Sequence, residues 1–174
     1  MFAVFAQQNS RRNRAARMLL PLLVYLLLAI VLTWPTIRQF STHLPGDGGD
    51  DPAIAWNLWW VKFALLNSSQ NPFHTDFMFY PLGVNLAFYT LTVLNALTAL
   101  PFTLNLGVTA ASNLHMLFTF VAGGYGAFLL VKYLLTHAEP GAPARRVWFS
   151  ALLAGGFYAF AGSKLFYVAL GQFN

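Results

Sequence analysis

The sequence predicts an all-α integral membrane protein with three transmembrane helices, or four if one further apolar stretch also crosses. Of its 174 residues, 57% are hydrophobic and only 9% are charged, with a mean hydropathy of +0.56. Soluble domains carry about 25% charged residues, so this chain has too few to coat a globule. At roughly 20 apolar residues per span, its length accommodates three or four spans and one large loop.

The basic residues indicate membrane topology rather than nucleic-acid binding. They cluster beside long apolar runs, as cytosolic flanks of transmembrane helices do: Arg11, Arg12, Arg14 and Arg17 precede the first run, and Lys132, Arg145 and Arg146 surround a later turn. We therefore expect no nucleic-acid partner. The absence of Cys excludes disulfides, thiolate metal sites and a Cys nucleophile.

The first apolar run predicts a retained transmembrane helix over residues 18–34, preceded by a basic cytosolic N-terminus over residues 1–17. Residues 18–34 are longer than a usual signal-peptide core, and no small-residue cleavage site follows them. Pro21 falls in the first turn, where a missing N–H is tolerated. Two later runs predict transmembrane helices over residues 108–135 and 147–170, joined by a turn at 136–146, with 171–174 at the outer end.

Residues 85–106 are the ambiguous segment, because they are long enough to cross but rich in Asn and Thr and contain Pro101. If they crossed, the turn with Lys132, Arg145 and Arg146 would lie outside. If they stay in the outer leaflet, seven of ten basic residues lie inside and four of five acidic residues lie outside, as the positive-inside rule favours. We therefore expect three crossings in the inner (plasma) membrane, with the N-terminus in the cytosol.

On this topology, residues 35–107 form one large extracytoplasmic loop. Within it, residues 53–66 have helical spacing of aromatic residues and predict a helix in the headgroup plane. Residues 85–106 predict a second interfacial helix, and 71–83 an irregular segment. Pairs of small residues four apart, Ala122 with Gly126 and Gly155 with Ala159, indicate where helices pack closely.

The stretch PGDGGDDP places three carboxylates, Asp47, Asp50 and Asp51, within five positions. Such a cluster can bind a divalent cation through oxygen ligands, or one carboxylate can act as a general base toward an acceptor hydroxyl. The alternative is a solvated turn that caps the helix following it. We therefore predict Asp47, Asp50 and Asp51 as catalytic candidates.

Two further sets of polar residues are candidates for binding. Asp47 and Asp51 together with His74 and Asp76 could hold a divalent cation, with His43 nearby, although no spacing among them is diagnostic. His115 lies within a span beside Asn113, where a functional or a hydrogen-bonded structural role is open. Lys164, Gln172 and Asn174, at the outer end of the last span, would suit the phosphate of a lipid donor. The alternative is that Lys164 only extends its ammonium to the interface.

The order of these features resembles the N-terminal part of GT-C-fold glycosyltransferases, the class of protein mannosyltransferases and aminoarabinose transferases. The stretches that carry the resemblance are PGDGGDDPAIAWNLWWVKFAL, NPFHTDFMFYPLGVNLAFYTLTVLNAL and AGGFYAFAGSKLFYVALGQFN. The resemblance implies transfer of a sugar from a polyprenyl-phosphate donor at the outer leaflet. It also implies that Asp47, with Asp50 and Asp51 as the other candidates, acts as base or helps hold a metal, while the 164–174 end flanks the donor phosphate.

Members of that superfamily have many more spans, and three could hardly enclose a lipid-sugar pocket. We therefore expect activity only as part of a longer chain. The alternative is a non-catalytic accessory subunit of a larger membrane complex, of respiratory or photosynthetic type, with other membrane subunits as partners. A transporter fragment is less favoured because the spans lack paired charges.

Overall fold

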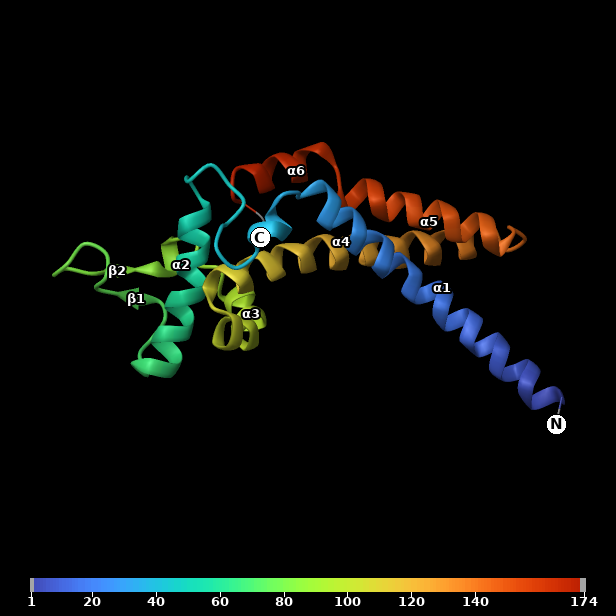
Figure 1. Ribbon diagram of the computed structural model, residues 1–174, viewed down its shortest axis with the longest axis horizontal. Helices are drawn as coiled ribbons and strands as arrows, with labels where there is room; N and C mark the ends of the chain where they lie inside the picture. Colours follow the sequence, from blue (N-terminus) through green and yellow to red (C-terminus); the bar gives the residue numbers. More distant parts are fainter. Residues whose placement is uncertain (1, 173–174) are drawn as a thin grey trace. The chain divides into compact units, whose positions relative to one another are not determined.

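The computed structural model describes the backbone of residues 2–172 and the side chains of residues 15–172. Most of this chain is helical (Figure 1), and the six α-helices are α1 (Phe2–Leu32), α2 (Asp51–Lys62), α3 (Val93–Leu106), α4 (Val108–Ala138), α5 (Ala144–Ala159) and α6 (Gly162–Ala169). Three segments are long and apolar enough to cross a membrane, namely Ala15–Leu32, Val108–Ala138 and Ala144–Ala169. The prediction of a helical membrane protein with three candidate spans is confirmed to this extent.

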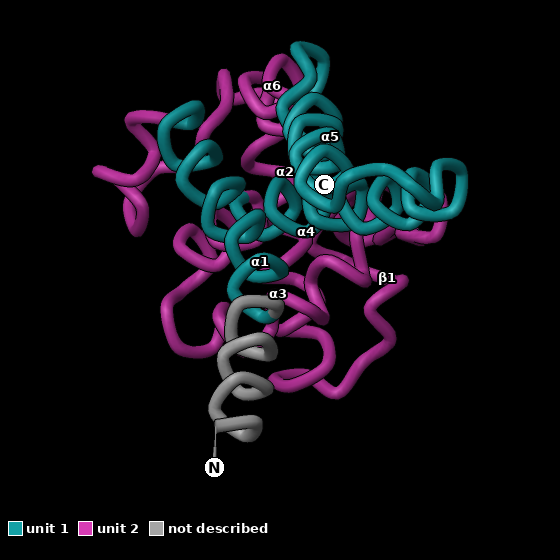
Figure 2. Tube along the Cα trace, turned by 90° about the vertical axis from the view of Figure 1, so that its right-hand side faces the viewer, with its two compact units in different colours: residues 1–33, 117–164 teal, residues 34–116, 165–174 magenta. Residues whose placement is uncertain are grey.

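The chain divides into two units (Figure 2). Unit 1 comprises residues 1–33 and 117–164, and unit 2 comprises residues 34–116 and 165–174. Helices α4 and α6 therefore each contribute to both units. Unit 1 holds most of the three spans, whereas unit 2 holds the polar segment and the last residues of the chain.

Unit 1 is a three-helix bundle in which α4 runs antiparallel to both α1 and α5. Its core contains Tyr25 of α1, Phe128 of α4 and Ala151 of α5, all fully buried. Along α4 and α5, Phe120 stacks on Phe160 at 5.2 Å between ring centroids, whereas Phe128 meets Trp148. Because the later residue of α4 meets the earlier residue of α5, these two helices are antiparallel.

The direction of α1 follows from two contacts with α4. Near the middle of the bundle, the ring of Tyr25 lies against Gly124. Further along α4, toward its C-terminal end, the Lys132 Nζ lies 2.9 Å from the Met18 sulfur. Because the later residue of α4 meets the earlier residue of α1, these two helices are antiparallel.

Two glycines allow the three helices of unit 1 to approach closely. A Cβ on Gly155 would lie 2.9 Å from Cζ of Tyr25, and closer still to the Tyr25 hydroxyl and the Gly124 carbonyl oxygen. The Tyr25 hydroxyl fills this notch and donates to the Leu152 carbonyl oxygen at 2.9 Å. The expected packing role of Gly155 and Ala159 is thus confirmed, since both are buried in the bundle. Ala122 and Gly126 are exposed instead.

Unit 2 is built on the packing of α2 against α3. Leu58 of α2, Ala99 of α3 and Ala111 of α4 form one buried cluster. A second cluster surrounds Trp60, which is fully buried and donates its indole N–H to the Pro72 carbonyl oxygen at 2.8 Å. The π-helical turn Phe63–Asn67 extends α2, so the helix expected over 53–66 is present with an earlier start at Asp51.

The helix expected over 85–106 begins later, at Val93. A short antiparallel pair of strands precedes it, β1 (His74–Thr75) and β2 (Val84–Asn85), with His74 opposite Asn85. The Asn85 side chain then accepts a hydrogen bond from the Ala87 N–H at 2.9 Å and starts a 3-10 turn, Leu86–Phe88. Asn85 therefore caps a turn instead of continuing a helix, and the segment expected to be irregular contains this hairpin.

The last expected span is interrupted. Helix α5 ends at Ala159 and α6 begins at Gly162, so residues 147–170 are two helices rather than one. The Phe160 N–H still bonds to the Gly156 carbonyl oxygen, but the Phe160 backbone has left the helical region, with φ −111° and ψ 29°.

Candidate functional site

The acidic loop, residues 45–51, is folded back on itself by two bonds from backbone amides to carboxylates. The Asp51 Oδ1 accepts from the Gly48 N–H at 2.9 Å, and the Asp47 Oδ1 accepts from the Gly49 N–H at 3.0 Å. Gly46 lies so close to Asp51 that an added Cβ would be 2.5 Å from its Oδ1. Gly48 and Gly49 therefore supply the N–H donors of this tight turn, and Gly46 leaves the space that it needs.

The last described residues of the chain close the acidic loop from a second side. The Gln172 side-chain amide donates to the Asp50 carboxylate. Gly171, at φ +80°, is buried against the start of α2, where an added Cβ would lie 2.6 Å from the Asp51 Cβ. Two segments far apart in the sequence thus meet within unit 2, and the structure brings Gln172 and the acidic cluster together.

The three aspartates have different surroundings. Asp51 is only 8% exposed, opens α2 and is enclosed by Gly46 and Gly171. Asp50 occupies the N-cap position of α2 but makes no capping bond with its side chain, because its carboxylate is turned to Gln172. Asp47 is exposed, and its second carboxylate oxygen has no partner among the residues that the structure describes. Asp47 and Asp50 are thus both exposed, and of the two only Asp50 has a side-chain partner among the described residues.

The segment before the acidic loop is tied to α4 by Asn113, which the sequence marked only as the neighbour of His115. The Asn113 amide donates to the carbonyl oxygens of Phe40 and His43, both at 2.8 Å. Asn113 is fully buried, so these bonds are shielded from water and fix the entry to the loop. The available signal was an amide side chain within a long apolar run.

Asn57 of α2 has a similar role that sequence reasoning missed. Its buried amide donates to the Thr90 carbonyl oxygen at 2.8 Å, which attaches the segment before α3 to α2. His115, by contrast, makes the kind of contact expected of a structural residue, since its Nε2 lies 3.4 Å from the Thr98 hydroxyl.

The residues predicted to hold a metal are not assembled into one group. His74 lies in β1, with its ring beside Gly83, and Asp76 is exposed just after that strand. Asp47 and Asp51 belong to the acidic loop. Across the described part of the chain, no three His, Asp or Glu side chains come close enough to share a metal ion.

The residues predicted to bind a donor phosphate fall in different units of the chain. Gln172 is engaged with Asp50, as described above, whereas Lys164 belongs to unit 1. There the Lys164 ammonium lies over the Tyr158 ring, 4.1 Å from its centroid, a cation–π contact. Asn174 lies outside the described residues.

An aromatic cluster lines α2 after the acidic loop. Trp56 stacks on Trp60 with ring centroids 5.5 Å apart, and Trp59 stacks on Phe63 at 5.2 Å. Trp56 and Trp59 are partly exposed. Aromatic faces of this kind can contact a sugar ring or lie at the lipid headgroup level. No family model, no curated protein and no solved structure matches this chain.

Proposed function

We propose that the acidic loop supplies the catalytic carboxylate of a GT-C-like glycosyltransferase, which transfers a sugar from a polyprenyl-phosphate donor at the outer leaflet. The observation that carries the proposal is the exposed carboxylate of Asp47 in a loop that hydrogen bonds hold in place. One oxygen of each aspartate is bonded, but Asp51 is buried and Asp50 is bonded by the Gln172 side chain, so among the described residues Asp47 is the aspartate of this loop that is exposed and has no side-chain partner. A positioned carboxylate with one free oxygen is what general-base catalysis needs.

In the proposed reaction, Asp47 accepts the proton of an acceptor hydroxyl. The hydroxyl oxygen then forms a bond to the anomeric carbon of the donor sugar while the bond from that carbon to the phosphate oxygen breaks. The polyprenyl phosphate leaves with the bonding electron pair as an anion. The proposed role of Asp50 and Asp51 is to hold the loop, because one oxygen of Asp51 accepts from the Gly48 N–H and one oxygen of Asp50 accepts from Gln172.

The direction of the helices supports an extracytoplasmic position for this loop. Because α1 and α4 are antiparallel in unit 1, an even number of crossings, most simply none, separates them. Residues 34–107 would then leave and re-enter the membrane on one side. Arg17 and Trp148 meet through a 2.7 Å hydrogen bond, so the basic ends of α1 and α5 lie together, and the positive-inside rule favours the cytosol for them.

The surface of α3 supports its position in the outer leaflet. Its buried side is made of small residues, Ala96, Ala99 and Thr103, whereas Leu94 and Leu104 are 74% and 56% exposed. Large apolar side chains outside and small ones inside are typical of helices packed within lipid. At about 1.5 Å per residue, its 14 residues reach about 21 Å, less than the roughly 30 Å of a bilayer core.

The proposal is tested with the full chain in nanodiscs, a panel of radiolabelled polyprenyl-phosphate sugars and an acceptor lipid extract. The Asp47→Asn variant should lose at least about a hundredfold in transfer rate, as loss of a general base does, while donor binding persists. Asp76→Asn is the matched control, because Asp76 is also an exposed aspartate of unit 2 but lies in the hairpin. Equal transfer by wild type and Asp47→Asn would rule out the site.

A non-catalytic accessory subunit is the second candidate, and one observation favours it. Ala122 and Gly126 form an exposed small-residue notch on α4, with nothing within 4 Å of a Cβ placed on Gly126. Such a notch accepts a neighbouring transmembrane helix. Stoichiometric co-purification with other membrane subunits that is lost in Gly126→Leu, together with no binding of any donor by the wild type, would select this alternative.

A further inference from the structure

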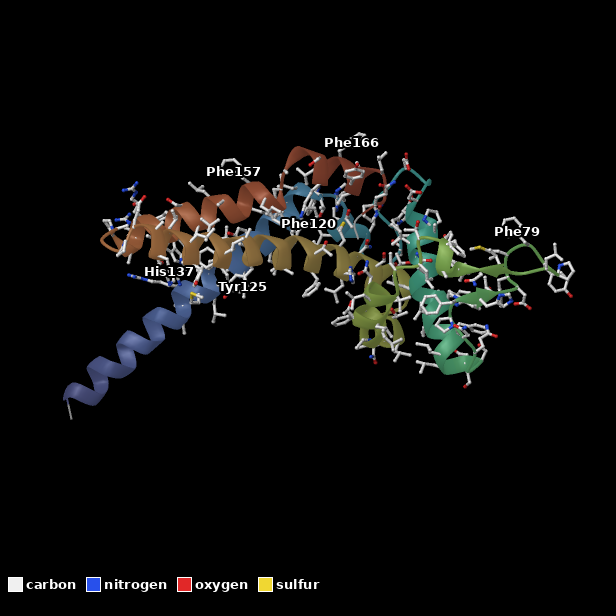
Figure 3. All side chains as sticks on the ribbon, turned by 180° about the vertical axis from the view of Figure 1, so that it is seen from behind. Phe79, Phe120, Tyr125, His137, Phe157 and Phe166 are labelled. Atoms are coloured by element: carbon white, nitrogen blue, oxygen red, sulfur yellow. The ribbon has the colours of Figure 1, made fainter. Side chains whose placement is uncertain are left out.

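The basic end of unit 1 gathers cationic side chains from all three of its helices. The Trp148 indole N–H donates to the Arg17 carbonyl oxygen at 2.7 Å, and the Lys132 ammonium lies 2.9 Å from the sulfur of Met18. Arg145 and Arg146 lie in the first turn of α5, just before Trp148. Figure 3 shows nitrogen-bearing side chains at this end of the bundle, near the labelled His137.

This end carries a surplus of positive charge. Among the described residues, Glu139 is the acidic residue there, and its carboxylate lies 3.8 Å from Arg146. Both side chains are largely exposed, at 51% and 70%, so the pair is weak and solvent-screened. A stronger anion could therefore take Arg146 from Glu139.

The two arginines of α5 are poorly placed for the helix itself. The positive end of the helix dipole lies at its N-terminus, where cations are unfavourable, yet Arg145 and Arg146 both occupy the first turn. Arg145 rests its guanidinium over the Phe149 ring, 5.6 Å from the centroid, which leaves its N–H donors at the edge of the apolar surface. A bound anion would offset the unfavourable position.

A recess at this end has the polarity of a lipid headgroup site. Leu135, Ala142 and Val147 form its apolar part, and Glu139, Arg146 and Ser150 its polar part. The Ser150 hydroxyl is exposed and makes no hydrogen bond within the described residues. Hydroxyl and guanidinium donors above an apolar floor match a phosphate that continues into acyl chains.

We propose that this recess binds the phosphate of an anionic phospholipid of the surrounding leaflet, with Arg146 and Ser150 as its donors and Arg145 adding charge. A net negative headgroup is preferred, because the cationic group of phosphatidylcholine would face the surplus positive charge. The site is independent of the proposed transferase activity and of the acidic loop.

The test uses the absence of native Cys. Gly141→Cys lies in the turn beside the recess, where an added Cβ meets nothing within 4 Å, and carries a bimane fluorophore. The labelled full chain is placed in phosphatidylcholine nanodiscs that contain an increasing fraction of a quencher lipid with a nitroxide near the top of its acyl chain. In one series the quencher lipid is phosphatidylglycerol, and in the other it is phosphatidylcholine. The mole fraction of nitroxide lipid that halves the fluorescence is measured for each.

Nitroxide phosphatidylglycerol should halve the fluorescence at a lower mole fraction than nitroxide phosphatidylcholine does. At low salt this mole fraction should fall by about fivefold for each arginine that contacts the headgroup. Arg145→Gln with Arg146→Gln should remove the preference, and Glu139→Gln should increase it. Arg38→Gln, which alters an exposed arginine of unit 2, should leave it unchanged; unchanged helicity by circular dichroism shows that each variant is folded. The proposal is overturned if both lipids quench alike in the unsubstituted protein, or if Arg11→Gln with Arg12→Gln removes as much preference as the α5 pair.

Discussion

The glycine at position 155 should be among the least replaceable residues of the bundle. In Gly155→Ala the new Cβ would lie less than 3.0 Å from the Tyr25 ring and nearer still to the Gly124 carbonyl oxygen. The tyrosine can rotate away, but the backbone oxygen of α4 cannot, so α5 must move off α4. Overpacking of this kind costs about 1–3 kcal/mol, and displacement of the Tyr25 hydroxyl from Leu152 adds about 0.5–1.5 kcal/mol.

We therefore expect Gly155→Ala to lower the free energy of unfolding by about 2–4 kcal/mol. Gly156→Ala is the matched control, because it is the adjacent glycine of the same helix and a Cβ there meets nothing within 4 Å. It should be neutral or stabilising by up to about 1 kcal/mol, since Ala is the better helix former. Gly124→Ala should be intermediate, because its Cβ would lie 3.0 Å from a Tyr25 ring carbon and no backbone atom is closer.

The assay is reversible unfolding in bicelles, with the two ends of the bundle labelled for steric trapping. Tyr25→Phe, which removes only the hydroxyl, should cost about 0.6 kcal/mol, the average for hydrogen bonds between membrane helices. The double variant Tyr25→Phe with Gly155→Ala should lose less free energy of unfolding than the sum of the two single variants. The reason is that the hydrogen bond of the Tyr25 hydroxyl can be lost only once. Equal stability of Gly155→Ala and Gly156→Ala would refute the close packing of α4 on α5.

The remaining predictions concern unit 2. Asn113→Ala should destabilise the protein by about 1–3 kcal/mol, because it removes two part-buried hydrogen bonds. Asn105→Ala, whose exposed amide bonds only within its own helix, is the control, and limited proteolysis of the loop is the readout. Gly171→Ala and Gly107→Ala both place a side chain at φ near +80°, which costs about 1–2 kcal/mol, but only at 171 does the Cβ meet Asp51. Gly171→Ala should therefore lower the free energy of unfolding more than Gly107→Ala does. It should also slow disulfide formation in a variant with Asp50→Cys and Gln172→Cys. Equal effects of the two alanine substitutions would contradict the close approach at 171. Trp60→Phe should lose the bond to Pro72 and destabilise the aromatic cluster by about 1 kcal/mol or more in the same unfolding assay.

Composition and apolar run length were enough to predict the helical membrane class and the three candidate spans. The run at 108–135 lies within α4 and the run at 18–34 lies in α1 except for its last two residues, because a long stretch with few charges has few alternatives in lipid. The break at Phe160 was invisible, since Ala, Phe and Gly around it are as apolar as the spans that they separate. The hydropathy of a segment predicts whether it can lie within a bilayer, but it does not predict whether its helix is continuous.

The candidate site was predictable in residue type and not in arrangement. Clustered aspartates between glycines marked the acidic loop, whereas the bond from Gln172 to Asp50 joins residues 122 positions apart in the sequence. Asn57 and Asn113 were missed as anchors because their partners are backbone carbonyls, which any residue can supply. The residues predicted to hold a metal do not form one group, because sequence spacing did not reveal that His74 and Asp76 belong to the hairpin.

The proposed function requires the acidic loop and the basic turn to lie on opposite sides of the membrane. Because the chain has no Cys, Ser41→Cys and Gly141→Cys can each be probed singly in intact cells with an impermeant maleimide that reaches the outer face of the membrane. The account predicts that Ser41→Cys is labelled and that Gly141→Cys is labelled only after the membrane is opened. Labelling of Gly141→Cys in intact cells, or protection of Ser41→Cys, would contradict it.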